Sequence, residues 1–208
     1  DGFAGLDLQR QAAQHVVSLA ARAVRVVLPD GRVETRRPRA VQAGDVVLVA
    51  SGERVTVYGD YDVDGATSAA LLVELLRQLG NDAGYYIPDR LLEGYGPSGE
   101  ALVRLGEEGS SLIVTVDCGA MAHQALGMAH DAGIDVIVVD HHKCAAELPL
   151  ATALVNPNRL DEDDLAASHG HLAAVGVAFL LAVATVRVLR LRGFFEGRSE
   201  PDLFLSLI

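Results

Sequence analysis

Residues 55–68 read VTVYGDYDVDGATS, and the fold class can be inferred from this stretch. Its first four residues are apolar or β-branched, which is typical of a short buried strand. We expect a helix from about Ala66 to Leu79 after the acidic turn, ended by Gly80. A strand, a turn and a helix in this order indicate the first unit of an α/β sheet.

The alternation of strands and helices continues along the rest of the chain. We expect further strands at 83–88, 112–117, 135–140 and 153–157, and helices at about 98–108, 122–132 and 171–192. Strands that lack an alternating pattern and are separated by helices predict an α/β fold, with a parallel sheet covered by helices on both faces. The apolar run at 172–186 is shorter than a membrane span requires, so we interpret it as part of a buried core helix.

Residues 1–54 follow a different pattern. We expect a helix at 3–24, a β-hairpin at 24–38 and another short strand pair at 41–55. We therefore divide the chain into an N-terminal helix with a small β-rich segment, 1–54, and a parallel α/β domain, 55–208.

The composition excludes some classes of protein. The net charge of −11 argues against a protein that coats nucleic acid, because such proteins usually present a basic face. A nuclease remains compatible, because carboxylates that hold metal ions add to the negative charge. The N-terminus lacks the basic and apolar regions of a secretory signal, and two cysteines do not make a disulfide framework. We expect a cytoplasmic protein without membrane contact.

Acids and histidines follow three of the expected strands. They are Asp60, Asp62 and Asp64 after the first strand, Asp117 at the end of the third, and Asp140, His141 and His142 at the end of the fourth. The carboxyl ends of parallel strands meet at one edge, where such folds bind ligands. Any single acid, Asp64 above all, could instead be a helix N-cap. The full set predicts a two-metal phosphoesterase site, and its donors suit Mn²⁺ or Mg²⁺.

Several motifs carry a family resemblance. VTVYGDYDVDGATS (55–68), VTVDCG (114–119) and VVDHH (138–142) resemble the successive motifs of the DHH phosphoesterase superfamily. PDRLLEGYGPS (88–98) and LVNPN (154–158) resemble its RecJ-like branch of single-strand exonucleases. The resemblance runs from about residue 52 to the end of the chain. It implies metal-dependent hydrolysis of phosphodiester bonds, with single-stranded DNA or a short oligonucleotide as substrate.

The resemblance also implies roles for individual residues. Those expected to hold two Mn²⁺ or Mg²⁺ ions are Asp62, Asp64, Asp117 and His141. Those expected to complete the catalytic site are Asp60, Asp140 and His142. Those expected to contact the nucleic acid are Arg90, Gly94, Tyr95 and Gly96, and an arginine is well suited to clamping a phosphate.

Two features depart from the family pattern. Members of the RecJ-like branch continue with another metal-ligating Asp and a second, substrate-binding domain, for which we find no counterpart before Ile208. We therefore expect an incomplete site that holds one ion firmly and the second loosely or not at all. Residues 8–54 resemble the start of the actuator domain of a metal-transporting P-type ATPase, so the chain resembles a chimera, and we expect no transport function.

Two alternatives stay open. A haloacid-dehalogenase-type phosphohydrolase would use the Asp62-Val63-Asp64 turn as its nucleophile and would form an aspartyl-phosphate. It also needs a later lysine, and Lys143 is the only lysine in the chain. The other alternative is a catalytically inactive fragment that binds nucleic acid or a protein, including self-association through the helix at 171–192.

Overall fold

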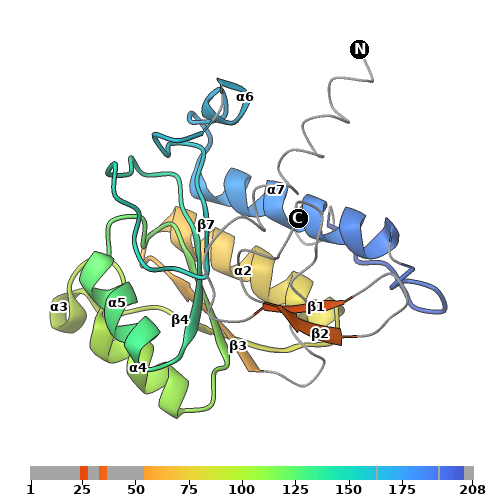
Figure 1. Ribbon diagram of the computed structural model, residues 1–208, viewed down its shortest axis with the longest axis horizontal. Helices are drawn as coiled ribbons and strands as arrows, with labels where there is room; N and C mark the ends of the chain where they lie inside the picture. The colour runs from red at the N-terminus through yellow and green to blue at the C-terminus, as the bar shows by residue number, and fades with distance from the viewer. Residues whose placement is uncertain (1–23, 28–32, 37–53, 163, 192, 204–208) are drawn as a thin grey trace.

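The computed structural model describes residues 24–27, 33–36, 54–162, 164–191 and 193–203 (Figure 1). A five-stranded sheet has the order β4–β3–β5–β6–β7, and every neighbouring pair is parallel. Its strands are β3 (Arg54–Gly59), β4 (Asp82–Tyr86), β5 (Leu112–Val116), β6 (Asp135–Val139) and β7 (Ala153–Val155). The predicted parallel α/β sheet is confirmed.

Strand β3 is the point from which the sheet grows in both directions. Val55 pairs with Ala83 of β4 on one side and with Leu112 of β5 on the other. The chain therefore runs from β3 to β4, then crosses back over β3 to build β5, β6 and β7. In parallel sheets the crevice outside the carboxyl ends of the strands at such a switch point is the usual ligand site.

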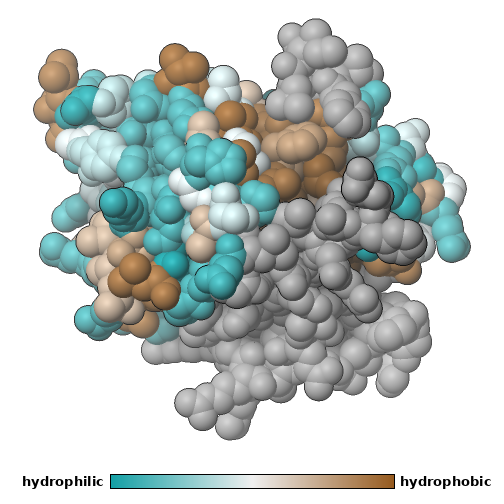
Figure 2. Space-filling view, turned by 90° about the horizontal axis from the view of Figure 1, so that it is seen from above, coloured by the Kyte–Doolittle hydropathy of each residue, from teal (hydrophilic) through white to brown (hydrophobic). Residues whose placement is uncertain are grey.

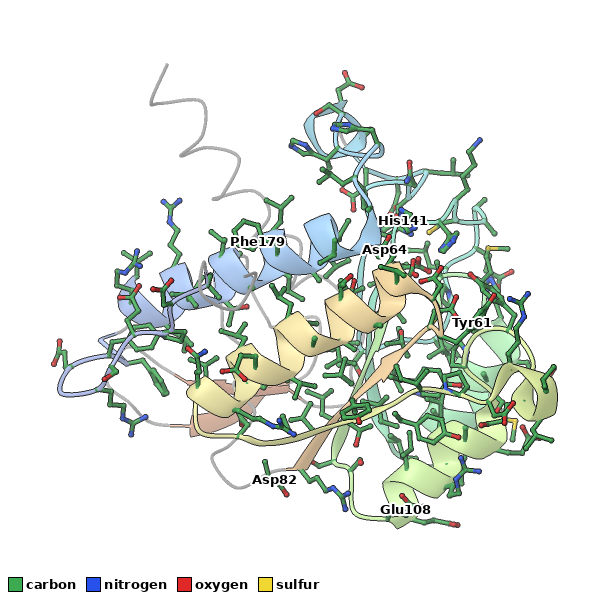
Figure 3. The ribbon with its side chains drawn as sticks, turned by 180° about the vertical axis from the view of Figure 1, so that it is seen from behind. Tyr61, Asp64, Asp82, Glu108, His141 and Phe179 are labelled. Atoms are coloured by element: carbon green, nitrogen blue, oxygen red, sulfur yellow. The ribbon has the colours of Figure 1, made fainter. Side chains whose placement is uncertain are left out.

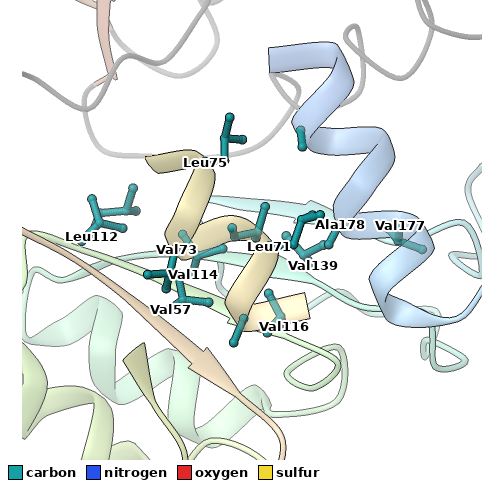
Figure 4. Packing of buried hydrophobic residues seen from close by; sticks show 14 of the residues in the cluster. Val57, Leu71, Val73, Leu75, Leu112, Val114, Val116, Val139, Val177 and Ala178 are labelled. Atoms are coloured by element: carbon teal, nitrogen blue, oxygen red, sulfur yellow. The ribbon is translucent and has the colours of Figure 1, made fainter. Parts of the chain in front are cut away.

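Helices cover both faces of the sheet, as predicted. On one face lie α2 (Val63–Gln78) and α7 (Ala174–Leu191), whose side chains share a buried cluster with β3, β5 and β6 (Figure 4). On the other face lie α4 (Gly99–Glu107) and α5 (His123–Asp131), which pack on Ile113, Val136 and Val138. Burying both faces explains why the strands are almost continuously apolar.

Helix α7 is apolar around most of its circumference. By length and composition it could cross a membrane, but core helices of soluble proteins pass the same test. Its side chains at Val177, Ala178 and Ala182 are buried against α2 and the sheet, in keeping with the predicted core helix. Figure 2, which views the molecule from above, shows an apolar area on the side where α7 lies.

Some element boundaries differ from the predictions. Helix α2 begins at Val63 rather than Ala66, because Asp62 is its N-cap and its Oδ1 accepts the N–H of Gly65 at 2.9 Å. The N-cap of this helix is therefore Asp62 and not Asp64. Two four-residue helices were not predicted: α3 (Arg90–Glu93) and α6 (Asp164–Ala167).

The described part of the N-terminal region is a short hairpin. Strands β1 (Val24–Val27) and β2 (Val33–Arg36) pair antiparallel, which confirms the hairpin. The predicted helix at 3–24 and strand pair at 41–55 lie almost wholly outside the described residues. The division at residue 54 and the actuator resemblance stay predictions.

Candidate metal centre

The predicted acids and histidines gather at the carboxyl edge of the sheet. Figure 3 shows Asp64 and His141 beside each other where α2 and α7 begin, with Tyr61 nearby. Asp82 and Glu108 lie at the opposite end of the sheet in the same view. The cluster is thus a local feature and not a general excess of acids.

Asp117 is the most unusual residue of the cluster. It is 2% exposed, and its φ of 61° is the only positive φ of a non-glycine residue in the described ranges. Burial, with the charges of Asp62 and Asp64, raises the pKa of Asp117 to about 7. Its Oδ1 accepts no hydrogen bond from any described residue. A buried carboxylate oxygen without a donor fits a place for a cation.

His141 is oriented by the backbone ahead of α7. Its Nδ1 lies 2.9 Å from the carbonyl oxygen of Leu172, and because a carbonyl can only accept, Nδ1 carries the hydrogen. Its Nε2 then faces the acids, 3.2 Å from Oδ1 of Asp117 and 3.9 Å from Oδ2 of Asp64. In the neutral ring, Nε2 has a lone pair that can bind the same cation as these carboxylate oxygens. Metal-binding histidines are commonly held in this way.

Asp140 organises the turn that carries both histidines. It is 1% exposed, and its Oδ2 accepts the N–H of Ala120 at 2.9 Å. Its Oδ1 accepts the N–H of His141 at 2.7 Å, and the N–H and Nδ1–H of His142 at 3.2 and 2.7 Å. Burial lowers the pKa of His142, but the hydrogen bond and charge of Asp140 outweigh burial and raise it. Both carboxylate oxygens of Asp140 thus accept hydrogen bonds that position Ala120 and the two histidines.

Asp60 and Asp62 differ in environment although they are two residues apart. Asp60 is buried, and its Oδ1 accepts the N–H of Tyr61 at 2.8 Å. Burial, then the charge of Asp62, raises the pKa of Asp60. Asp62 is exposed, and the N–H of Gly65 lowers its pKa. The two pKa values therefore shift in opposite directions, because the start of a helix favours the negative charge of Asp62 whereas burial disfavours that of Asp60.

Asp64 joins the start of α2 to the start of α7. Its Oδ2 accepts the N–H of Ala174 at 2.8 Å, and its Oδ1 accepts the N–H of Val175 at 2.9 Å. Each oxygen keeps a second lone pair, so this contact does not prevent Asp64 from meeting a cation. It does give Asp64 a structural role that sequence patterns could not indicate, since the two segments are 110 residues apart.

The ligand atoms form two adjoining groups that share one carboxylate. One group is Asp117, His141 and His142, and the other is Asp60, Asp62 and Asp117. Within each group the atoms lie within 4.8 Å of one another. Oxygen and imidazole donors suit Mn²⁺, or Mg²⁺ with more water, and a shared carboxylate suits two ions. Among the described residues, Asp64 belongs to neither group, whereas Asp60 and His142 belong to one each.

The predicted substrate residues border the centre. The guanidinium of Arg90 lies 4.4 Å from the ring centroid of Tyr61, and its charge opposes the burial that raises the pKa of Asp60. Tyr95 is 60% exposed between Gly94 and Gly96, whose φ values are 84° and 75°.

A cleft of about 650 Å³ adjoins these residues. One wall comes from residues 95–100 and the other from residues 118–125, and Asp140 and His142 also line it. The cleft therefore extends from the predicted substrate-binding residues to His142.

Two asparagines bind the backbone carbonyls of the histidines. The amide nitrogen of Asn156 donates to the carbonyl of His142 at 2.7 Å. The amide nitrogen of Asn158 donates to the carbonyls of His141 and Gly170, at 2.5 and 3.1 Å. Both belong to the motif LVNPN (154–158), which carries part of the family resemblance. Their role was missed because it depends on a contact between separate loops.

Comparison with known proteins gives consistent matches. The model of the DHH family, N-terminal domain, matches residues 54–200. The single-stranded-DNA-specific exonuclease RecJ of Dickeya dadantii is 43% identical over 158 residues, which are 74% of this chain and 27% of the relative. That of Escherichia coli is 44% identical over 149 residues, which are 71% of this chain and 25% of the relative. The chain spans about a quarter of the length of these relatives.

Solved structures agree with the sequence matches. A crystal structure of exonuclease RecJ bound to manganese has a TM-score of 0.56 and 38% identity, covering 72% of this chain and 35% of that one. RecJ from Thermus thermophilus in complex with Mn²⁺ has a TM-score of 0.52 and 34% identity, covering 72% of this chain and 19% of that one. Both of those proteins bind manganese.

Proposed function

Because the chain belongs to the DHH family, we propose that its carboxylate cluster is a two-metal centre that hydrolyses phosphodiester bonds in single-stranded DNA. The observation that carries the proposal is the buried carboxylate of Asp117, shared by two ligand groups at the switch point of the sheet. The similarity to single-stranded-DNA-specific exonucleases supports the choice of substrate.

We propose Mn²⁺ or Mg²⁺ as the ions. Asp62, Asp117 and His141 would hold them, with Asp64 contributing through its remaining lone pairs. Asp117 lies in both groups and is our candidate for the bridging ligand. Such ions, when bound, activate water and neutralise charge on the phosphate. The manganese found in the similar RecJ structures supports this choice.

The remaining residues would orient the substrate and handle protons. His142 has a raised pKa and is fixed through Nδ1, so its other nitrogen can donate a hydrogen bond to a phosphate oxygen. Asp140 would act by holding His142, and Asp60 by supplying a carboxylate beside the ions. Arg90, with Tyr95 and its flanking glycines, would contact the DNA backbone and bases. We propose that this reaction takes place in the cytoplasm.

The test is hydrolysis of an oligonucleotide by the purified chain. With Mn²⁺, we expect nucleotides to be released from a single strand faster than from the duplex, and EDTA to abolish release. Asp117→Asn should lose at least about a hundredfold in rate, because a neutral amide cannot bridge two cations. Asp82→Asn makes the same change at the opposite edge and should leave the rate unchanged.

Three outcomes would contradict the proposal. Trapping of an aspartyl-phosphate would point to the haloacid-dehalogenase-type reaction. Unchanged turnover in Asp117→Asn would show that hydrolysis does not use this centre. A chain that binds DNA but releases no nucleotides under any metal would be the inactive binding fragment.

A further inference from the structure

The segment that carries Arg90 and Tyr95, residues 88–98, stands at the rim of the centre; we call it the rim loop. Leu91 is 94% exposed and Leu92 is 84% exposed. Hydrophobic burial therefore contributes little to fixing this part of the loop. The loop must be held by other contacts if Arg90 and Tyr95 are to keep one position.

A polar network holds the middle of the rim loop. Oη of Tyr86 donates to Oε1 of Glu93 at 2.6 Å, and the N–H of Asp89 donates to the same oxygen at 3.1 Å. Nη2 of Arg104, on α4, donates to Oη of Tyr86 at 2.6 Å and lies 3.7 Å from Oε2 of Glu93. Glu93 thus connects the rim loop to β4 and to α4.

A second contact holds the end of the rim loop. Oη of Tyr58, on β3, donates to the carbonyl of Gly96 at 3.2 Å. The ring centroids of Tyr58 and Tyr86 are 5.3 Å apart, so the two tyrosines that hold the rim loop also pack against each other. Tyr95 lies between Glu93 and Gly96, and Arg90 lies in the same short helix as Glu93. Both substrate-facing residues are therefore close in sequence to an anchored position.

Glu93 is an acid of the rim loop that does not belong to the metal centre. It is absent from both ligand groups in the described structure, and its carboxylate is directed at Tyr86, Asp89 and Arg104. Its Oε2 is buried, and Arg104 is the cation beside it. The geometry therefore fits a structural partner of the rim loop rather than a metal ligand.

We propose that Glu93 is a positioning residue that, through Tyr86 and Arg104, holds Arg90 and Tyr95 in place before the DNA binds. The inference rests on the proposed function, which makes the rim loop a substrate-binding segment. A loop that is ordered before binding loses less conformational entropy when the substrate binds. Removing the Glu93 side chain should therefore weaken substrate binding more than it slows the chemical step.

The first test is hydrogen exchange of the free protein. Glu93→Ala and Tyr86→Phe should exchange the amide hydrogens of 89–98 faster than wild type, whereas β5 and β6 should be unchanged. Glu107→Gln, at an exposed position of α4, is the control and should exchange like wild type. Unchanged exchange in 89–98 for both test variants would overturn the proposal.

The second test separates positioning from catalysis. With Mn²⁺ and a single-stranded oligonucleotide, Glu93→Ala should raise KM roughly tenfold and change kcat by less than about twofold. Glu93→Gln keeps an oxygen that can accept from Tyr86 and Asp89, so it should recover most of the wild-type KM. If Glu93→Gln and Glu93→Ala lowered kcat or Mn²⁺ affinity equally, the proposal would be overturned, and Glu93 would be a metal ligand instead.

The two hypotheses fail in different ways. If the wild type released no nucleotides, the proposed function would fail. The exchange comparison and an oligonucleotide-binding titration would still decide the role of Glu93. Active wild type with no change of KM in Glu93→Ala would refute only the positioning role.

Discussion

At the residue scale, the centre depends on acids whose environments differ. Asp62 sits at a helix start that stabilises its charge, whereas Asp117 is buried among other acids. Sequence motifs could predict both as site residues because each follows a strand end. They could not predict the unequal pKa values, which depend on burial and on partners brought together only by folding.

The raised pKa of Asp117 predicts how stability depends on pH without metal. An acid whose pKa is about 7 when folded, and near 4 when unfolded, binds a proton in the folded state between these values. The free energy of unfolding should therefore fall by a few kcal/mol through this group as pH rises from about 4 to 7. Asp117→Asn should flatten this dependence. The measurement is urea denaturation in EDTA at several pH values, and an equally steep fall in the variant would contradict the assignment.

Asn158 gives a second prediction at this scale. Its amide fixes the carbonyl of His141, so Asn158→Ala should let the imidazole move and should weaken Mn²⁺ binding roughly tenfold. Asn81→Ala, which removes an amide bonded to the carbonyl of Leu76, is the matched control. Calorimetric titration with Mn²⁺ compares them, and equal affinities would show that the backbone contact does not position the ligand.

At the scale of elements, the ends of helices build the centre. Asp62 caps the start of helix α2, and α7 begins where Asp64 accepts two of its N–H groups. The order of strands and helices could be predicted because apolar runs and glycines mark it locally. The packing of α7 on Asp64 could not be predicted, because no local sequence pattern in either segment indicates a contact with the other.

The contact with α7 predicts an effect of Asp64 that a pure metal ligand would not have. Without metal, removing a ligand carboxylate relieves repulsion and should stabilise the fold. Asp64→Ala should instead destabilise it by about 1–2 kcal/mol, because two N–H groups at the start of α7 lose their acceptor. Urea denaturation in EDTA measures the difference. A stabilised variant would mean that the α7 contact contributes nothing.

At the scale of the whole molecule, the sheet topology explains why distant motifs form one site. Strands β3 and β5 are neighbours although α2, β4 and α4 lie between them in sequence, and this crossover brings Asp60 and Asp117 to one crevice. The match to the DHH family covers the same residues, 54–200. The net charge of −11 fits a protein whose acids are balanced by bound cations.

The position of bound manganese would show whether the carboxylate cluster is a two-metal centre. Crystals soaked in Mn²⁺ would be measured at the manganese absorption edge, where anomalous scattering locates the ions without assumptions about ligands. We expect a peak in contact with Asp117 and His141, and a second, weaker peak beside Asp60 and Asp62. Ordered crystals with no anomalous peak at Asp117, or with manganese bound only elsewhere, would contradict it.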